Sequence, residues 1–214
     1  GTTGDIYVSD YESDGSGTVV ERYNKGADAI QALKQGKIDC VVIDEQPAIK
    51  FVEQNTGIRI LDEEFTLEDY AFVVAKSNTE LLDKVNSALE KLEADGTIAN
   101  IQKNYIGTAD EIGKFPYESK DVSHENGTLT VGTNAEFPPY ESYEDGQIVG
   151  IDMDIMRAVS DELGMELKIE DMAFDSIIPA ISTGKVDIGA AGFTVTEERK
   201  KNVNFTDTYT TSKQ

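Results

Sequence analysis

The sequence predicts an α/β protein with two lobes. Two observations predict this class: short strand-like runs alternate with amphipathic helical runs, and one helix–strand unit occurs twice. In residues 30–39 and 178–187, a helical run, a glycine and a Lys-(Ile/Val)-Asp sequence follow one another in the same order. Ordinary α/β sequences can produce such a match by chance, but two similar lobes explain it better.

The strand-like runs are short, apolar and rich in β-branched residues. They lie at 19–23, 38–43, 58–61, 70–75, 129–133, 167–170 and 186–190. The helical runs have apolar residues three and four positions apart, and they lie at 27–35, 45–54, 80–94, 98–105, 151–163 and 176–183. Glycines follow several helical runs, where a left-handed residue ends a helix: Gly36, Gly57, Gly96, Gly164 and Gly184.

The two ends of the sequence resemble the interior of a domain. Residues 1–4, Gly-Thr-Thr-Gly, are typical of the turn at a helix start that normally follows a strand. Residues 205–214 stop where a β-prone run begins. Between them, residues 107–127 lack either hydrophobic period and are expected to form a surface linker.

The composition excludes several classes of function. With 19 basic and 41 acidic residues, the net charge of −22 disfavours nucleic-acid binding. No apolar run approaches the ~20 residues of a membrane helix, and no signal peptide is present, so an exported protein would have lost its leader. The single cysteine, Cys40, is expected to be a buried packing residue. The single histidine, His124, lies in the predicted linker, and we expect neither a metal site nor a cofactor.

The strongest candidate for binding chemistry is the run 192–199, which follows the predicted strand 186–190. Turn N–H groups and the guanidinium of Arg199 at the carboxyl end of a strand can clamp a carboxylate. The alternative is a helix capped by Thr194 or Thr196 and followed by a solvent-facing arginine. Local sequence alone slightly favours this alternative.

Three further positions lie where a predicted strand ends. Asp44 follows the run 38–43, where it can cap the next helix, its default role, or bind an ammonium group. Phe137 lies in a loop that two prolines hold extended, and Phe174 lies at another strand-to-helix joint. Both aromatics can face a cleft or anchor their loops in the core, and for each alone the second role is favoured.

No catalytic pattern is present. The sequence lacks a Gly-x-Ser-x-Gly elbow, a phosphate-binding loop and a dinucleotide fingerprint after a strand. Because His124 lies in the linker, a histidine-activated nucleophile is not expected.

Several stretches together resemble the polar amino-acid solute-binding proteins of ABC importers, which have the small type II periplasmic-binding fold. The stretches are 129–141, 150–155, 174–180 with 184–187, and 192–199 with 203–207. The resemblance covers nearly the whole chain outside the linker.

The resemblance implies a circularly permuted, two-lobed fold whose natural ends are joined through the linker. The implied domains are 1–68 as an incomplete lobe 2, 69–76 as a hinge crossing strand, 77–106 as the C-terminal helices of lobe 1, 107–127 as the linker, 128–207 as lobe 1, and 208–214 as the start of the second hinge strand. Between the equivalents of Gln214 and Gly1, the family has a crossing strand, a helix and a second strand, roughly 20–30 residues. Their absence would expose sheet edges, so a second chain or fragment is expected to complete lobe 2.

The resemblance also assigns roles to the site residues. It implies that Arg199, Thr194 and the backbone of Thr3 bind the α-carboxylate of an amino acid. Asp44 and the carbonyl of Gly192 would bind its α-ammonium group. A cation and an anion held apart suit a zwitterion.

For the ligand side chain, the resemblance implies a sandwich between Phe137 and Phe174, aided by Asn134. Several relatives that prefer basic amino acids carry an aspartate where this chain has Asn134, which favours a polar, neutral ligand. Glu136 and Asp175 lie close by in sequence and are the candidate specificity residues that could compensate.

The function implied is extracytoplasmic. The chain would capture a polar amino acid between its lobes and deliver it to the membrane subunits of an ABC transporter, from the periplasm or from a lipid anchor at the cell surface. One alternative is a dehydratase-like enzyme on the same scaffold, with Glu136 as the only candidate acid. Another is an engineered, permuted or split amino-acid sensor component. Asp44, as an ammonium partner, favours the binding protein over the enzyme.

Overall fold

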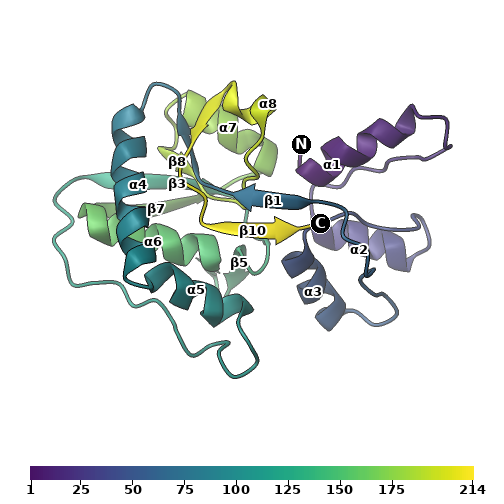
Figure 1. The fold of residues 1–214 in the computed structure, drawn as a ribbon, viewed down its shortest axis with the longest axis horizontal. Helices are drawn as coiled ribbons and strands as arrows, with labels where there is room; N and C mark the ends of the chain where they lie inside the picture. The colour runs from purple at the N-terminus through teal and green to yellow at the C-terminus, as the bar shows by residue number, and fades with distance from the viewer. The chain divides into compact units, whose positions relative to one another are not determined.

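The computed structural model describes all residues, 1–214, and divides them into two compact units (Figure 1). Unit 1 contains Gly1–Glu68 and Thr211–Gln214, and unit 2 contains Asp69–Thr210. The chain leaves unit 1 along β1 (Leu67–Tyr70) and returns along β10 (Thr210–Lys213), and these strands pair in a two-stranded sheet. No helix is both long enough and apolar enough to cross a membrane.

Unit 2 is built on a five-stranded sheet in the order β7-β3-β8-β2-β9. The central strand β3 (Thr128–Thr133) runs parallel to β7 (Glu166–Asp171) and to the short β8 (Ile188–Gly189). β2 (Val73–Ala75) pairs antiparallel with both β8 and β9 (Val203–Phe205). The predicted strand at 70–75 is therefore two strands, β1 and β2, separated by Ala71 and Phe72.

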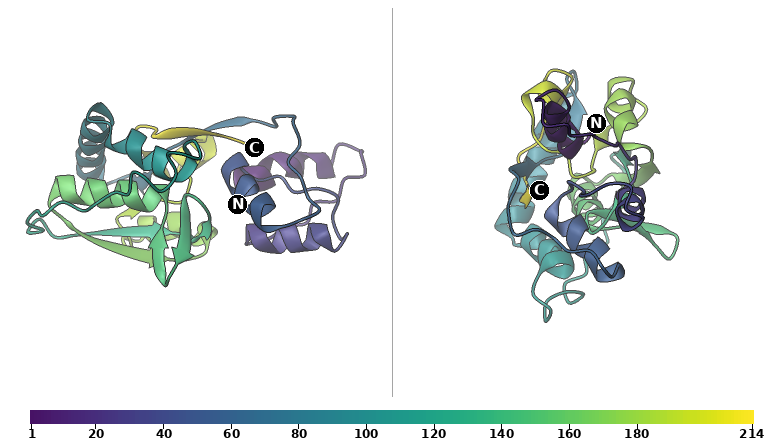
Figure 2. Two further views of the ribbon diagram at one scale, coloured as in Figure 1. Left: turned by 90° about the horizontal axis from the view of Figure 1, so that it is seen from below. Right: turned by 90° about the vertical axis from the view of Figure 1, so that its right-hand side faces the viewer.

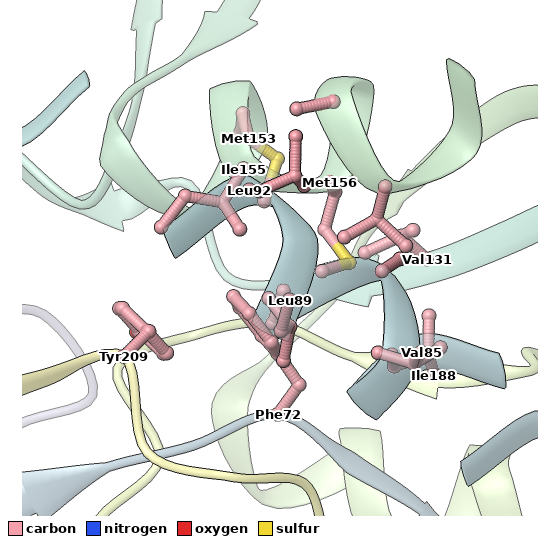
Figure 3. Close-up of a cluster of buried hydrophobic side chains, with 14 of the residues drawn as sticks. Phe72, Val85, Leu89, Leu92, Val131, Met153, Ile155, Met156, Ile188 and Tyr209 are labelled. Carbon is pink, nitrogen blue, oxygen red and sulfur yellow. The ribbon is translucent and has the colours of Figure 1, made fainter. Parts of the chain in front are cut away.

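Five helices belong to unit 2: α4 (Thr79–Ala94), α5 (Thr97–Ile106), α6 (Ile151–Leu163), α7 (Phe174–Ser182) and the short α8 (Glu197–Lys200). One hydrophobic cluster joins α4, α5 and α6 to the sheet, and a second joins α7 to it. Figure 3 shows part of the first cluster, with residues from α4, α6 and the strands converging on one another.

Neighbouring residues of β2 belong to different hydrophobic clusters. Val74 belongs to the cluster with α4, α5 and α6, and Val73 belongs to the cluster with α7. Because successive side chains of a strand point to opposite faces, the two clusters lie on opposite faces of the sheet. Unit 2 therefore has helices and a buried core on both faces of its sheet.

A three-stranded antiparallel sheet of β4 (Glu136–Phe137), β5 (Glu141–Glu144) and β6 (Gln147–Val149) completes unit 2. Asp145 and Gly146 form the two-residue turn between β5 and β6, with φ values of 48° and 80°. Two positive φ values fit the turn type that matches strand twist, and Asp-Gly favours it.

The linker lacks helix and strand between 107 and 127 and is attached to α6. The hydroxyl of Tyr117 donates to Asp161 Oδ2 at 2.7 Å, and the N–H of Lys120 donates to the same oxygen at 2.8 Å. These bonds satisfy a carboxylate that is almost fully buried.

Unit 1 consists of helices and connecting coil, apart from the ends of β1 and β10 (Figure 2). Its helices are α1 (Thr3–Ser9), a 3₁₀ turn (Asp10–Glu12), α2 (Gly26–Lys34) and α3 (Glu45–Gln54). All six predicted helices of the chain form, with boundaries within two residues of those expected. A further helix, α1, begins at the predicted Gly-Thr-Thr-Gly turn.

The three strands predicted within unit 1 are wrong for this structure. Residues 19–23, 38–43 and 58–61 form no strand, and Cys40 is exposed rather than buried. A strand needs a neighbour for its backbone hydrogen bonds, and none pairs with these segments. Both hydrophobic clusters lie in unit 2, and unit 1 adds only Ala29, Ile30, Ala32 and Phe51 to the buried hydrophobic residues.

Candidate functional site

Three parallel strands of unit 2 end at one edge of the sheet and place most of the predicted site residues there. The segment 134–137, which includes β4, follows β3, Phe174 follows β7, and the run 192–199 follows β8. The carboxyl ends of parallel strands in an open α/β sheet are the usual place for a ligand. The predicted residues that belong to unit 2 are Asn134, Glu136, Phe137, Phe174, Asp175, Gly192, Thr194 and Arg199.

Arg199 is held in place by a hydrogen bond and two aromatic rings. Its Nη1 donates to the carbonyl of Thr194 at 3.0 Å, and its guanidinium carbon lies 5.4 Å from the ring centre of Phe174. The same carbon lies 5.5 Å from the ring centre of Phe193. Cation–π contacts of this kind both orient and stabilise a guanidinium. The side chain is thus buried, at 8% exposure, and not the solvent-facing arginine of the alternative interpretation.

The turn before Arg199 is shaped by its own hydrogen bonds. Thr196, and not Thr194, caps α8, and its side-chain oxygen accepts from the N–H of Arg199 at 3.1 Å. Thr194 instead forms an isolated β-bridge with Tyr70 and is buried. The backbone before Arg199 is therefore held by the bridge from Thr194 to Tyr70 and by the cap that Thr196 forms on α8.

Gly192 occupies a position that a side chain would disturb. Its φ of +54° lies in the left-handed region, and a Cβ there would lie 3.0 Å from Phe137 Cε1 and 3.2 Å from Tyr70 Cε2. Its N–H donates to Asp152 Oδ2 at 2.9 Å. The glycine lets Phe137 approach the backbone closely.

Asp152, at the start of α6, is the fully buried acid behind this turn. Burial raises its pKa to about 6, although hydrogen bonds from Gly192 N–H and the Tyr209 hydroxyl lower it. Burial and the neighbouring Asp152 carboxylate in turn raise the pKa of Tyr209 well above its usual range.

Phe137 and Phe174 each stack on another aromatic ring. Phe137 lies 5.6 Å from Tyr140 between ring centres, and Phe174 lies 4.8 Å from Phe193. Both rings thus belong to aromatic pairs at the strand ends, and each also packs at the margin of a hydrophobic cluster. Each of the two phenylalanines therefore helps to anchor its own segment to the hydrophobic core of unit 2.

Asn134 and Glu136 lie close together after β3, where Glu136 begins β4. Asn134 Nδ2 donates to the carbonyl of Met172 at 3.0 Å, and the N–H of Glu136 donates to the carbonyl of Asn134 at 2.7 Å. The Asn134 side chain thereby ties the end of β3 to the end of β7. Asp175 lies in the first turn of α7.

Asp44 and Thr3 belong to unit 1. Asp44 occupies the N-cap position of α3, but its side chain makes no capping hydrogen bond, and the residue is buried. Thr3 lies at the start of α1, where its hydroxyl donates to Glu68 Oε2 at 2.9 Å and accepts from Gln214 Nε2 at 2.8 Å. The default prediction was that Asp44 caps the next helix. Asp44 does occupy the N-cap position, but the predicted capping hydrogen bond does not form.

Sequence reasoning did not single out three residues that shape the site: Tyr70, Asp152 and Phe193. The signal for Asp152 is an acid directly after a Gly-Ile pair at the start of an apolar helix. Phe193 lies inside the run 192–199, beside the glycine already identified. Tyr70 carries no local signal, because it reaches the site only through the antiparallel bridge to Thr194.

Comparison with protein families matches residues 17–108 and 129–214, most of the chain, to the bacterial extracellular solute-binding proteins, family 3. The arginine-binding protein ArgT of Corynebacterium glutamicum is 44% identical over 39% of this chain and 28% of its own length. The arginine-binding extracellular protein ArtP of Bacillus subtilis is 40% identical over 39% of this chain and 33% of its own length. A probable histidine-binding protein of Campylobacter jejuni is 35% identical over 40% of this chain and 34% of its own length.

The chain therefore spans about a third of the length of these curated relatives. Among solved structures, an ancestral arginine-binding protein bound to glutamine is 49% identical, with a TM-score of 0.37, over 38% of this chain and 36% of its own. The arginine-bound form of domain 1 from TmArgBP is 50% identical, with a TM-score of 0.35, over 35% of this chain and 60% of its own.

Proposed function

The chain belongs to the bacterial extracellular solute-binding proteins, family 3, and on that premise we propose that it captures a polar amino acid for delivery to an ABC importer. The observation that carries this proposal is the fixed guanidinium of Arg199 at the carboxyl edge of the unit 2 sheet. A buried, oriented arginine can bind a carboxylate through two parallel hydrogen bonds.

Arg199 is the proposed partner of the ligand α-carboxylate, with Thr194 and the backbone of Thr3 as further contacts. Asp44 and the carbonyl of Gly192 are the proposed partners of the α-ammonium group. The opposite charges of Arg199 and Asp44 suit a zwitterion.

Phe137 and Phe174 are the proposed walls for the ligand side chain. Their stacking on Tyr140 and Phe193 supports this role, because a ring that is already ordered loses little entropy on binding. Asn134 is proposed to help position the ligand side chain, and Glu136 and Asp175 are proposed to tune specificity.

Two observations point to different charges on the side chain of the preferred ligand. Asn134 favours a neutral polar amino acid, whereas the three relatives described above are named for arginine or histidine. A net charge of −22 also raises the local concentration of cations. Arginine, histidine and glutamine are therefore the ligands to test first.

We also propose the wider setting that the resemblance implies. The fold would be circularly permuted, with its natural ends joined through the linker, and a second chain or fragment would be a further partner. The protein would act outside the cytoplasm, in the periplasm or on a lipid anchor, beside the membrane subunits of its transporter. The dehydratase-like alternative finds no support in the family description or in the names of the relatives.

A thermal-shift screen against the twenty amino acids tests the proposal. A true ligand at 100 times its dissociation constant should stabilise the folded chain by about 2.7 kcal/mol. The D-enantiomer of the best ligand is the matched control, since it has the same charges in a different arrangement. If no amino acid shifts the unfolding transition, the proposal of amino-acid binding is wrong.

A further inference from the structure

Two acidic side chains are buried together behind the Gly192 turn. Glu141, the first residue of β5, and Asp152, in the first turn of α6, are both fully buried. Tyr209, directly before β10, is also buried and contacts Asp152. A buried carboxylate is costly unless donors compensate its charge, so the state of these two acids requires a physical explanation.

Both side-chain oxygens of Asp152 accept hydrogen bonds from donors. Oδ2 accepts from the Gly192 N–H at 2.9 Å, and a backbone N–H can only donate. Oδ1 accepts from the Tyr209 hydroxyl at 2.6 Å, which lies within the range of about 2.5–2.7 Å for an O–H that donates to a charged oxygen. This arrangement suits the ionised form of Asp152.

Glu141 is a third hydrogen-bond partner of Asp152. Two ionised carboxyl groups cannot hydrogen-bond to each other, because both are acceptors only, so one of the two must hold a proton. The oxygens of Asp152 already accept from Gly192 and Tyr209, which places the proton on Glu141. Burial raises the pKa of Asp152 to about 6, and the hydrogen bond with Glu141 is among the influences that lower it.

The other titratable groups that face this pair are tyrosine hydroxyls. Burial raises the pKa of Tyr209 well above its usual range, and Asp152, Glu141 and Tyr140 are the titratable groups that act on it. Since a tyrosine ordinarily titrates near pH ~10, the Tyr209 hydroxyl keeps its proton at neutral pH. Any change of protonation near neutral pH therefore falls on Glu141 and Asp152.

Asp152 connects the buried pair to the candidate site through the Gly192 turn. The carbonyl of Gly192 is the proposed partner of the ligand α-ammonium group, and its N–H is held by Asp152. A charged acceptor holds an N–H roughly twice as strongly as a neutral one. The restraint on this turn thus depends on the charge of Asp152.

We propose that Glu141 and Asp152 share one proton near neutral pH, that Glu141 holds it, and that the pair positions the Gly192 turn for the ligand. Glu141 is a positioning residue, since it acts through Asp152. Protonation of Asp152 at lower pH weakens its hold on the Gly192 N–H. Only the last step, from the turn to the ligand, rests on the proposed function.

The unfolding equilibrium of the ligand-free chain reports the proton on Glu141. An unfolded glutamate is ionised above about pH 5, so unfolding at neutral pH releases this proton. Stability from Glu141 is therefore lost as the pH rises. Between about pH 6.5 and pH 8.5, the unfolding constant of the parent should increase about tenfold per pH unit relative to that of Glu141→Gln. Urea titrations measure this ratio, and a constant ratio would overturn the shared proton.

The amide proton of Gly192 reports the charge of Asp152 without any ligand. Its chemical shift should follow the pH with a midpoint near pH 6 in the parent chain. Glu141→Met removes the donor to Asp152, so the midpoint should rise by about one pH unit or more. Glu141→Gln keeps an N–H donor and should restore a midpoint near that of the parent. Equal midpoints in the three chains would overturn the role of Glu141.

Calorimetry with arginine and glutamine, whose charges do not change in this range, tests the last step. At pH 6, Glu141→Met should bind about fivefold more weakly than the parent, because a smaller fraction of its molecules has an ionised Asp152. At pH 8 this difference should nearly vanish, and Glu141→Gln should resemble the parent at both values.

A loss of affinity in Glu141→Met that is equal at pH 6 and pH 8 would indicate a structural role and overturn the positioning role. If neither amino acid binds the parent chain, the proposed ligands are wrong, whereas the two ligand-free measurements still decide whether Glu141 and Asp152 share a proton. Circular dichroism of both variants confirms that each one folds.

Discussion

At the scale of single residues, the candidate site depends on how the guanidinium group of Arg199 is held in place. Arg199 rests on Phe174 and Phe193, and its Nη1 bonds to the carbonyl of Thr194. This support pre-organises the guanidinium before any ligand arrives, which reduces the entropy lost on binding.

Replacing Arg199 by alanine should weaken binding of the best amino acid at least about 100-fold, since charged hydrogen bonds of this kind contribute roughly 3 kcal/mol or more. Arg199→Lys is the matched control: it keeps the charge, loses the planar fork, and should bind with intermediate affinity. Calorimetry measures both, and circular dichroism checks that the variants fold. An unchanged dissociation constant for Arg199→Ala would remove the carboxylate assignment.

Asp152 makes the stability of unit 2 depend on pH. Burial raises the pKa of its carboxyl from 3.8 to about 6, so the folded chain holds a proton that the unfolded chain releases between these values. Stability from this group is therefore present at low pH and lost as the pH rises through about 6.

An Asp152→Asn variant should lose this dependence. Its free energy of unfolding, relative to the parent chain, should rise by on the order of 2 kcal/mol between pH 4 and pH 7. Urea titrations of both chains at several pH values measure the difference. A difference that stays constant over this range would show that Asp152 does not titrate there.

At the scale of elements, the linker is held to α6 by a buried carboxylate. Tyr117 and the N–H of Lys120 both donate to Asp161. The absence of a hydrophobic period correctly predicted that 107–127 has no helix or strand, but it gave no sign of this attachment. The attachment depends on a residue of α6 that lies 44 positions further along the chain.

Tyr117→Phe should destabilise unit 2 by roughly 1–2 kcal/mol, because it removes a donor from a buried charge. Tyr143→Phe is the matched control, since its hydroxyl donates to Asp171 Oδ2 at 3.2 Å in an exposed pair. We expect that control to change the free energy of unfolding by less than about 0.5 kcal/mol. Equal effects of the two substitutions in urea denaturation would contradict this account.

At the scale of the whole molecule, the two units differ in what stabilises them. Both hydrophobic clusters lie in unit 2, and unit 1 has few buried hydrophobic residues. Most of the burial that drives folding is thus in one unit. We therefore expect unit 1 to have a lower free energy of unfolding than unit 2.

Hydrogen exchange should reveal this difference. Amides of α2 and α3 in unit 1 should exchange at least about tenfold faster than amides of α4 and α6 in unit 2, because local opening follows the amount of buried apolar contact. These helices have similar amphipathic patterns, which makes them a fair comparison. Equal protection of the two pairs of helices would show that unit 1 is as stable as unit 2.

Local sequence signals are enough to predict the helices, the parallel strands of unit 2 and the strand ends at which the site residues lie. Helix and glycine signals are local, and the parallel strands β3 and β7 formed because their neighbours are present in the chain. Segments 19–23, 38–43 and 58–61 have equally good strand patterns, yet tertiary structure decided against them. A strand is stabilised by its neighbours, whereas most of the hydrogen bonds of a helix are its own.

Tertiary structure also decided which residues support Arg199 and Gly192. Tyr70 and Asp152 come from parts of the chain that are distant from Gly192, and their approach to the Gly192 turn follows from tertiary packing and not from any local motif. A sequence pattern can place a residue at the end of a strand. Only the packing of distant strands determines which side chains lie beside it, because those contacts depend on the register and order of the whole sheet.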